Sequence, residues 1–190
     1  MNELALAFSA IFVSNIILTQ FLGICSFLGV SKNIKNALGM SAAVTFVLIL
    51  ASVITWLAYY FILLPLDVAF LKTIIFILTI ASLVQLVEMF LKKHSPELYR
   101  NMGVYLPLIT TNCAILGVAL INIQKNYTFS SSLVNALANA AGFMLAMLLM
   151  SSIRERLEDA DLPECMKNLP IALITASCMS IALMGLSGII

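Results

Sequence analysis

The sequence has little charge. Only 10% of its 190 residues are Asp, Glu, Lys or Arg, and one is histidine, whereas soluble domains carry about 25% charged residues. Hydrophobic residues make up 62% of the chain, against roughly 45–50% in soluble domains. So few charges cannot cover a water-exposed surface, and this composition excludes a conventional soluble enzyme.

The chain also lacks clusters of metal-binding side chains. Its four cysteines stand at positions 25, 113, 165 and 178, without a C-x-x-C pair, and the only histidine is His94. This spacing excludes a zinc site or a thioredoxin-like motif made by this chain alone. There is no Gly-rich strand-to-helix fingerprint, so we expect no nucleotide site. We expect no structural disulfides, because Cys165 is assigned to a cytoplasmic loop, where thiols stay reduced.

Long apolar runs dominate what is present. A helix needs about 20 apolar residues to cross a bilayer, and the sequence has six such runs, at 4–30, 38–64, 68–91, 102–123, 131–152 and 169–190. Little is left for a soluble domain, so we predict an all-α integral membrane protein with one membrane domain over residues 1–190. Glu3 stands where a signal peptide carries positive charge, so the first run is predicted to be a transmembrane helix.

The basic residues are unevenly distributed between the connecting segments. If all six runs cross the membrane, one side receives only Lys72 and Lys125. The positive-inside rule then makes the richer side cytoplasmic and predicts both termini on the outer side. The basic residues of the cytoplasmic side are Lys32, Lys35, Lys92, Lys93, Arg100, Arg154, Arg156 and Lys167.

One motif occurs twice. The pattern C-x-x-L-G-V begins at Cys25 and again at Cys113, a shift of 88 residues. Each half, about 1–92 and 93–190, then holds three helices, and an odd number makes the second half enter the membrane from the opposite side. We therefore predict two inverted three-helix repeats. Weaker matches at shifts of 99 and 95 pair Ala37, Leu38 and Ala42 with Ala136, Leu137 and Ala141, and Leu78, Ala81 and Ser82 with Leu173, Ala176 and Ser177.

Glycines flank the first cysteine. Gly23 and Gly29 lie on either side of Cys25, and glycine weakens a helix. A straight helix from Leu4, at 1.5 Å per residue, would carry Cys25 close to the cytoplasmic face. Either the first helix therefore breaks near Gly23, or the two repeated cysteines lie at different depths.

The fourth run has its own helix breakers. Pro107 removes a helical hydrogen bond, and Asn112 and Gly117 bracket Cys113. We predict broken first and fourth helices, whose freed backbone must be buried in protein or line a cavity.

Several interpretations of the cysteines remain open. Cys25 and Cys113 could be inert small hydrophobes, but their repetition beside helix breakers favours a shared site. A disulfide between these two cysteines is an alternative, but it does not require helices that are broken at glycines. A two-iron, two-sulfur (2Fe-2S) cluster needs four thiolates, so the other two would come from an identical chain or an inverted paralogue. We interpret Cys165 and Cys178 as structural.

Glu88 is the acid most deeply embedded in an apolar run. It lies in LVQLVEMFLKK, and an acid in such a position predicts a role in cation or proton passage. An equally good interpretation is an ion pair with Lys92, four residues later on the same helix face. The sequence leaves both interpretations open, and a role of Glu88 in ion coupling is the prediction that we keep.

A cluster shared between two proteins would make this chain an electron-relay subunit. Two other classes of function compete with this interpretation. One is a cofactor-free secondary transporter with an inverted-repeat fold, which needs polar groups at the midplane to bind a solute. The other is a structural scaffold, which leaves the repeated motif unexplained. The polar groups available to a transporter are mainly Thr110, Thr111, Asn112 and Asn139.

Four segments carry a resemblance to a known family. They are FLGICSFLGVSK (21–32), LPLITTNCAILGVAL (106–120), IRERLEDADLP (153–163) and ALITASCMSIALMGLSG (172–188). They closely resemble the A-subunit family of the Rnf electron-transport complex (RnfA, also RsxA), over essentially the whole chain. The resemblance to the homologous E subunits of the sodium-pumping NADH:quinone oxidoreductase is weaker.

This resemblance implies a six-helix component of a prokaryotic cytoplasmic (inner) membrane that pairs with an inverted paralogue, RnfE. Two cysteines from each protein would hold one 2Fe-2S cluster, and Cys25 and Cys113 match those positions. The complex, with RnfB, RnfC, RnfD and RnfG as further subunits, would move electrons between ferredoxin and NAD and couple this to Na+ or H+ translocation. One departure is Ser26, which stands where many relatives have proline.

Overall fold

The chain folds as helices joined by short connections. The computed structural model describes residues 3–66, 69–94, 108–109, 112–158, 163 and 166–186. Within these ranges all regular structure is helical, which confirms the predicted all-α class. The elements are α1 (Glu3–Phe8), the π-helix η1 (Ser9–Val13), α2 (Ile24–Val30), α3 (Ile34–Ala58), the π-helix η2 (Tyr59–Leu63), α4 (Leu64–Leu66), the 3-10 helix η3 (Ala69–Leu71), α5 (Lys72–His94), α8 (Cys113–Gln124), α9 (Phe129–Glu158) and α10 (Leu169–Leu186).

Three helical stretches of the described residues are long and apolar enough to cross a membrane. They are Ile34–Leu63, Lys72–Met89 and Phe129–Leu157, and they coincide with the second, third and fifth predicted runs. Two shorter apolar helices, Cys113–Gln124 and Leu169–Gly185, lie within the fourth and sixth runs. This pattern supports a multi-pass membrane protein, while the six crossings stay a prediction.

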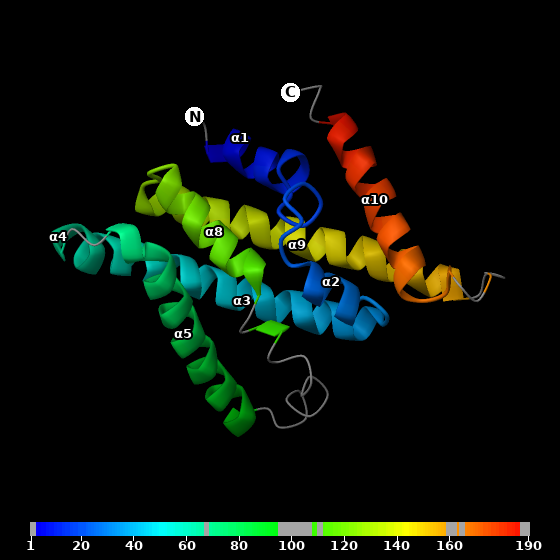
Figure 1. Ribbon diagram of the computed structural model, residues 1–190, viewed down its shortest axis with the longest axis horizontal. Coiled ribbons are helices and arrows are strands. Elements are labelled where there is room, and N and C mark those ends of the chain that lie inside the picture. The colour runs from blue at the N-terminus through cyan, green and yellow to red at the C-terminus, as the bar shows by residue number, and fades with distance from the viewer. Residues whose placement is uncertain are drawn as a thin grey trace.

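Helices α3 and α9 form the centre of the molecule and run side by side in opposite directions (Figure 1). Near the end of α3, the ring of Trp56 packs edge-on against that of Phe129 at the start of α9, with the centroids 5.2 Å apart. At the other end of the pair, Arg154 of α9 donates a hydrogen bond to Ser31, just before α3. Lys35 and Arg154, which the charge distribution assigned to one side, therefore share one end of the pair.

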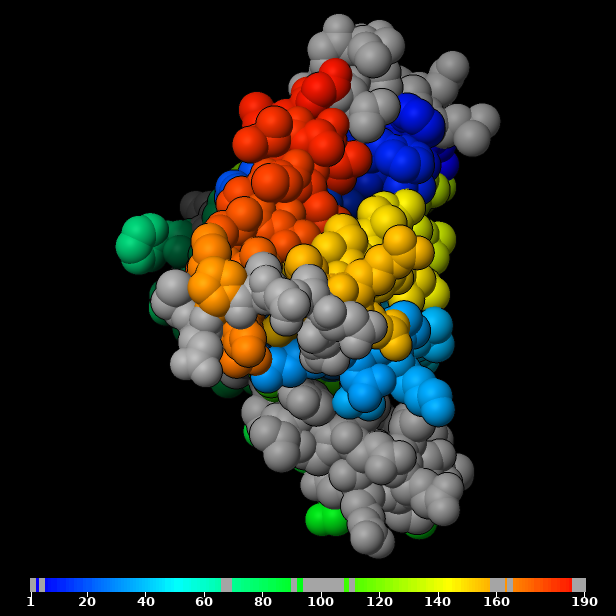
Figure 2. All heavy atoms as spheres, turned by 90° about the vertical axis from the view of Figure 1, so that its right-hand side faces the viewer, coloured from blue at the N-terminus to red at the C-terminus, as the bar shows by residue number. Residues whose placement is uncertain are grey.

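Figure 2 views this end of the molecule, with the last part of α9 between α10 and the beginning of α3. Arg154 was expected in a polar connecting segment here, and that expectation is wrong. Helix α9 continues to Glu158, and Arg154 is only 8% exposed. Its side chain points into the protein, where Nη1 donates to the carbonyl of Leu28 in α2.

The buried positions of α3 recur on α9 99 residues later. Ala37 and Ala136 are both fully buried, whereas Leu38 and Leu137 are 49% and 48% exposed. Further pairs that are buried in both helices are Met40 and Asn139, Val44 and Phe143, Val47 and Ala146, Leu48 and Met147, Ala51 and Met150, and Ser52 and Ser151. The shift read from a few residues of sequence thus also describes the burial pattern between Ala37 and Ser52 of α3.

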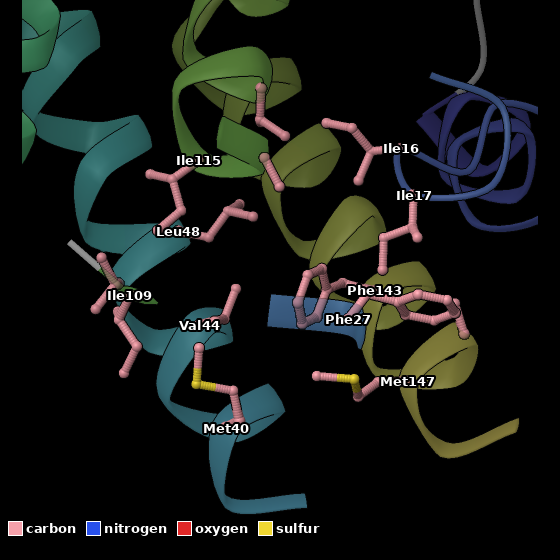
Figure 3. Packing of buried hydrophobic residues seen from close by; sticks show 14 of the residues in the cluster. Ile16, Ile17, Phe27, Met40, Val44, Leu48, Ile109, Ile115, Phe143 and Met147 are labelled. Atoms are coloured by element: carbon pink, nitrogen blue, oxygen red, sulfur yellow. The ribbon is translucent and has the colours of Figure 1, made fainter. Parts of the chain in front are cut away.

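The short helix α2 is anchored in the core by its apolar face. Phe27 is 1% exposed and lies beside Phe143 of α9, in the same buried cluster as Met40 of α3 and Met147 of α9 (Figure 3). Within a bilayer such close packing, rather than exclusion of water, holds helices together. The packing of Phe27 therefore determines which face of α2 turns inward.

Candidate functional site

An irregular segment, residues 14–23, interrupts the first apolar run between η1 and α2. Its polar backbone groups are satisfied by buried side chains. Asn15 donates from Nδ2 to the carbonyl of Gly142 at 2.9 Å and accepts the amide of Ile17 at 3.1 Å. The hydroxyl of Ser180 in α10 donates to the carbonyl of Leu18 at 2.6 Å. The freed backbone is thus buried in protein, as irregular structure at membrane depth requires.

The break ends at Gly23, where the sequence predicted it. Gly23 has a φ of 86°, a left-handed conformation that side chains with a Cβ adopt only at a cost. A Cβ on Gly23 would also lie 3.3 Å from Ala114 Cβ and from a ring carbon of Phe143. Glycine is therefore required here both for its backbone conformation and for close packing.

The two glycines of the repeated motif itself, unlike Gly23, do not break a helix, and that part of the prediction is wrong. Gly29 lies inside α2 and Gly117 inside α8. A Cβ on Gly117 would stand 2.5 Å from Cδ1 of Leu22, whereas a Cβ on Gly29 would meet no atom within 4 Å. Gly117 thus allows the irregular segment to approach α8 closely. Pro107, the other predicted breaker, lies outside the described residues.

The N-termini of α2 and α8 meet at the two repeated cysteines. Cys113 is the first residue of α8, and Cys25 is the second residue of α2. The amide of Gly23, directly before α2, donates a hydrogen bond to Cys113 Sγ at 2.9 Å. The two thiols, 88 positions apart in sequence, therefore lie in the first turns of two helices whose N-termini are in contact.

The chain does not enclose its two repeated cysteines. Cys25 is exposed on the surface of the chain and Cys113 is partly exposed. A second protein could therefore approach both residues.

A side-chain bridge joins the two helix starts. Asn112 caps α8, since its Oδ1 accepts the amide of Ala114 at 3.0 Å, and its Nδ2 donates to Ser26 Oγ at 3.5 Å. The hydroxyl of Ser26 in turn donates to the carbonyl of Gly23 at 2.9 Å. Ser26, at the position where the resemblance led us to expect proline, is fully buried and connects the first turn of α2 to the cap of α8.

A second polar cluster, here called the amide network, ties α8 to α3 and α9. Asn122 donates to Ser52 at 2.9 Å and accepts from Asn135 at 2.7 Å. Asn139 donates to the carbonyl and side-chain oxygens of Asn135, and Ser52 bonds to Ser132 at 3.2 Å. The only signal of this network in the sequence was the presence of asparagines within apolar runs.

The hydrogen bonds of the buried asparagines argue against a solute site of the kind that the transporter alternative needs. Asn112 and Asn139, two of the residues considered for solute binding, are at most 6% exposed and hydrogen-bond to the protein itself. Thr110 and Thr111, the other two, lie outside the described residues. The described part of the chain thus uses its buried amides to hold helices together.

The remaining predicted residues lie apart from the cysteines or outside the described ranges. Glu88 is half-buried in the C-terminal part of α5, which lies away from α2 and the start of α8 (Figure 1). Its role in ion coupling stays a prediction. Cys178 is exposed on α10, and Cys165 is not described. Among the described residues no group of three or more His, Cys, Asp or Glu could hold a metal ion, so a cluster here would need ligands from a second chain.

Comparison with known proteins identifies the family. The family model described as "Rnf-Nqr subunit, membrane protein" matches residues 4–190. One relative is the A subunit of the Na(+)-translocating ferredoxin:NAD(+) oxidoreductase complex of Acetobacterium woodii. It is 57% identical to this chain over 188 residues, a match that covers 99% of this chain and 98% of the relative.

Two further relatives agree. The A subunits of the complexes named ion-translocating oxidoreductase in Syntrophotalea carbinolica and Serratia proteamaculans are 49% and 52% identical, each over 100% of this chain and 98% and 99% of their own length. The match therefore includes both cysteine motifs and all the helices described above, and the chain belongs to the Rnf-Nqr family of membrane subunits.

Proposed function

We propose that this chain is the membrane subunit of an ion-translocating ferredoxin:NAD oxidoreductase (Rnf) complex, in which Cys25 and Cys113 supply two of the four ligands of an intramembrane 2Fe-2S cluster. The observation that carries the proposal is the contact between Gly23 and Cys113, because it brings two cysteine-bearing helix starts together. The other two thiolates would come from the paralogous protein RnfE.

The residues fit such a group. A 2Fe-2S cluster takes four thiolates, and this chain offers two cysteines at helix starts that are in contact. Their accessibility leaves room for a second protein to complete the ligand set. When bound, the cluster would accept and release one electron at a time. The hydrogen bond from Gly23 to Cys113 Sγ would contribute to its potential, because bonds to ligand sulfurs are among the factors that set that potential.

The fold supports an inverted-repeat arrangement with broken first and fourth helices. Helices α3 and α9 are antiparallel and share a burial pattern at a constant shift, and α5 and α10 lie on opposite sides of this pair (Figure 1). We propose six membrane crossings in a prokaryotic cytoplasmic membrane, with both termini outside. The same arrangement lets an inverted paralogue present its cysteines to those of this chain.

Ion coupling is the second part of the proposal. The relatives are named as ion-translocating, and that of Acetobacterium woodii as Na(+)-translocating. Electron transfer through RnfB, RnfC, RnfD, RnfG and the pair of membrane subunits would be coupled to movement of Na+ or H+. Glu88 is the acid of the apolar runs that we propose to test for this role, with Glu88→Gln and ion transport by vesicles that contain the complex.

The cluster assignment can be tested in the purified complex. We expect the complex to contain two iron atoms more than its other subunits bind. After reduction it should give the electron paramagnetic resonance signal of a 2Fe-2S cluster. Cys25→Ser and Cys113→Ser should each abolish this signal. Cys178→Ser, on the exposed face of α10, is the matched control and should leave the signal unchanged. A signal that survives both ligand substitutions would overturn the assignment.

A further inference from the structure

Arg154 is a buried cation that the proposed function does not use. It lies on α9, is 8% exposed, and its Nη1 donates to the carbonyl of Leu28 and to the hydroxyl of Ser31, both at 2.8 Å. Burying a charged side chain is costly unless it is paired or hydrogen-bonded, so the partners of Arg154 indicate its role. The contacts of Arg154 show that this role concerns the end of α2.

The guanidinium caps α2. The last carbonyls of a helix have no partner within the helix, and a cation at that end interacts favourably with both the carbonyls and the helix dipole. Helix α2 has only seven residues, and isolated helices of fewer than about 12–15 residues are marginal. The position of α2 therefore depends on its contacts with α9 and α8.

The first turn of α2 carries Cys25, and its far end is held by Arg154. The bridge of Asn112 and Ser26 holds the start of the same helix, so the two anchors enclose the cysteine. We infer that Arg154 is a positioning residue that holds Cys25 in register with Cys113. This inference rests on the proposed function, in which the two thiolates bind one cluster.

The equivalent position in the other half of the repeat carries no cation. The residue 99 positions before Arg154 is Thr55, whose hydroxyl bonds to carbonyls of its own helix, at 2.6 Å to Ala51 and 3.3 Å to Ser52. Helix α8, with 12 residues, is instead held by the amide network through Asn122. Arg154 thus acts on the cysteine of the first motif.

The first measurement does not depend on the cluster. The sample is membranes that contain the full complex stripped of iron, with Cys165 and Cys178 replaced by serine. The peptide that carries Cys113 is followed by mass spectrometry, which separates it from Cys25 and from the other subunits. The rate at which a maleimide labels this peptide reports whether the amide of Gly23 still bonds to the sulfur of Cys113. In Arg154→Gln we expect this rate to rise about tenfold, the factor that corresponds to loss of one charged hydrogen-bonded cap. Arg156→Gln, an exposed arginine two residues further along α9, should leave the rate unchanged.

The second measurement uses the loaded complex. Arg154→Gln should shift the g-values of the reduced cluster or lower its signal per complex, and Arg154→Lys, which keeps the charge but not the geometry of the guanidinium, should restore part of it. If Arg154→Gln does not accumulate in the membrane, Ser31→Ala removes one acceptor and should give a smaller acceleration of labelling.

Several outcomes would overturn the inference. One is a labelling rate and a spectrum in Arg154→Gln that equal those of the wild type. Another is a change in Arg156→Gln as large as that in Arg154→Gln. Where Ser31→Ala has to replace Arg154→Gln, an unchanged labelling rate in Ser31→Ala would also overturn it. A wild-type complex without a cluster signal would instead refute the proposed function, and with it the claim that Cys25 is held as a ligand. In that case the labelling rates would still show whether Arg154 determines the position of α2.

Discussion

The two copies of the C-x-x-L-G-V motif occupy different settings. In the second copy, helix α8 begins at a capping asparagine, Asn112, runs for 12 residues and carries a partly exposed thiol. In the first copy, helix α2 follows the left-handed Gly23, for which no side-chain cap is formed, runs for seven residues and carries an exposed thiol.

This difference separates what the motif determines from what its surroundings determine. Val30 and Val118, the last residues of the two motifs, are 2% and 1% exposed, so each copy turns the same face inward. Their supports differ, because α2 is held at its end by a guanidinium and α8 by neutral amides. A repeated motif can thus keep its inward face while each half anchors it with its own chemistry.

The largest expected change in stability is that of Asn135→Ala, compared with Asn36→Ala at the position 99 residues earlier. Asn135 is buried in the amide network, whereas Asn36 is exposed on α3. Asn135→Ala should lower the free energy of unfolding by about 1–3 kcal/mol, because the buried Oδ1 of Asn122 loses its donor. Asn36→Ala should change it by less than about 0.5 kcal/mol. Titration with sodium dodecyl sulfate, followed by circular dichroism, measures both, and equal losses would contradict the difference between the halves.

Replacing the glycines on either side of Cys25 by alanine should change the stability in opposite directions, with a loss at Gly23 and a gain at Gly29. Gly23→Ala should cost about 1–2 kcal/mol because of its left-handed backbone, with a further loss from crowding against Ala114 and Phe143. Gly29→Ala, in open space within α2, should gain up to about 1 kcal/mol from helix propensity. The same detergent titration compares them, and a harmful Gly29→Ala would show that α2 is held differently.

The cap of α8 offers a smaller effect. Asn112→Ala removes the acceptor for the amide of Ala114 and should cost about 1 kcal/mol. Asn112→Asp keeps the capping oxygen and loses the amide that donates to Ser26, so it should cost less. Thermal unfolding in detergent ranks the two variants. If Asp is as harmful as Ala, the bridge to Ser26 matters more than the cap.

The smallest effect concerns Ser52 and Ser151, another pair 99 residues apart. Ser52 bonds to Asn122 and Ser132, whereas the buried hydroxyl of Ser151 has no hydrogen-bond partner among the described residues. Ser52→Ala should lower the stability by about 1 kcal/mol, and Ser151→Ala should raise it by up to about 1 kcal/mol. Thermal unfolding shows the sign of each change, and a loss of stability in both variants would refute this contrast.

Much of the fold could be predicted from local patterns. Apolar run length located the three long helices, the weakening of a helix by glycine indicated the break near Gly23, and the shift of 99 residues matched α3 to α9. The glycines at 29 and 117 were misjudged, because a glycine that breaks a helix and one that permits close packing look the same in sequence. Only the approach of Leu22 distinguishes Gly117.

The candidate site was predicted in its residues but not in its supports. Cys25 and Cys113 stood out because their motif is repeated, and the structure places their helix starts in contact. Arg154 was assigned to a connecting segment because positive charge usually marks a helix end, and nothing nearby in sequence reveals that Leu28 and Ser31 lie within its reach. Such contacts join residues more than a hundred positions apart, which no local pattern encodes.

Sequence by itself determined the apolar composition, the helical class, the repeated cysteine motif and the family, because these follow from residue type and spacing along the chain. Tertiary structure alone decided that the N-termini of α2 and α8 meet, that Ser26 and Asn112 bridge them, and that a buried arginine holds the far end of α2. The physical reason is that helix propensity and hydropathy act locally, whereas the partner of each buried polar group depends on how distant helices pack.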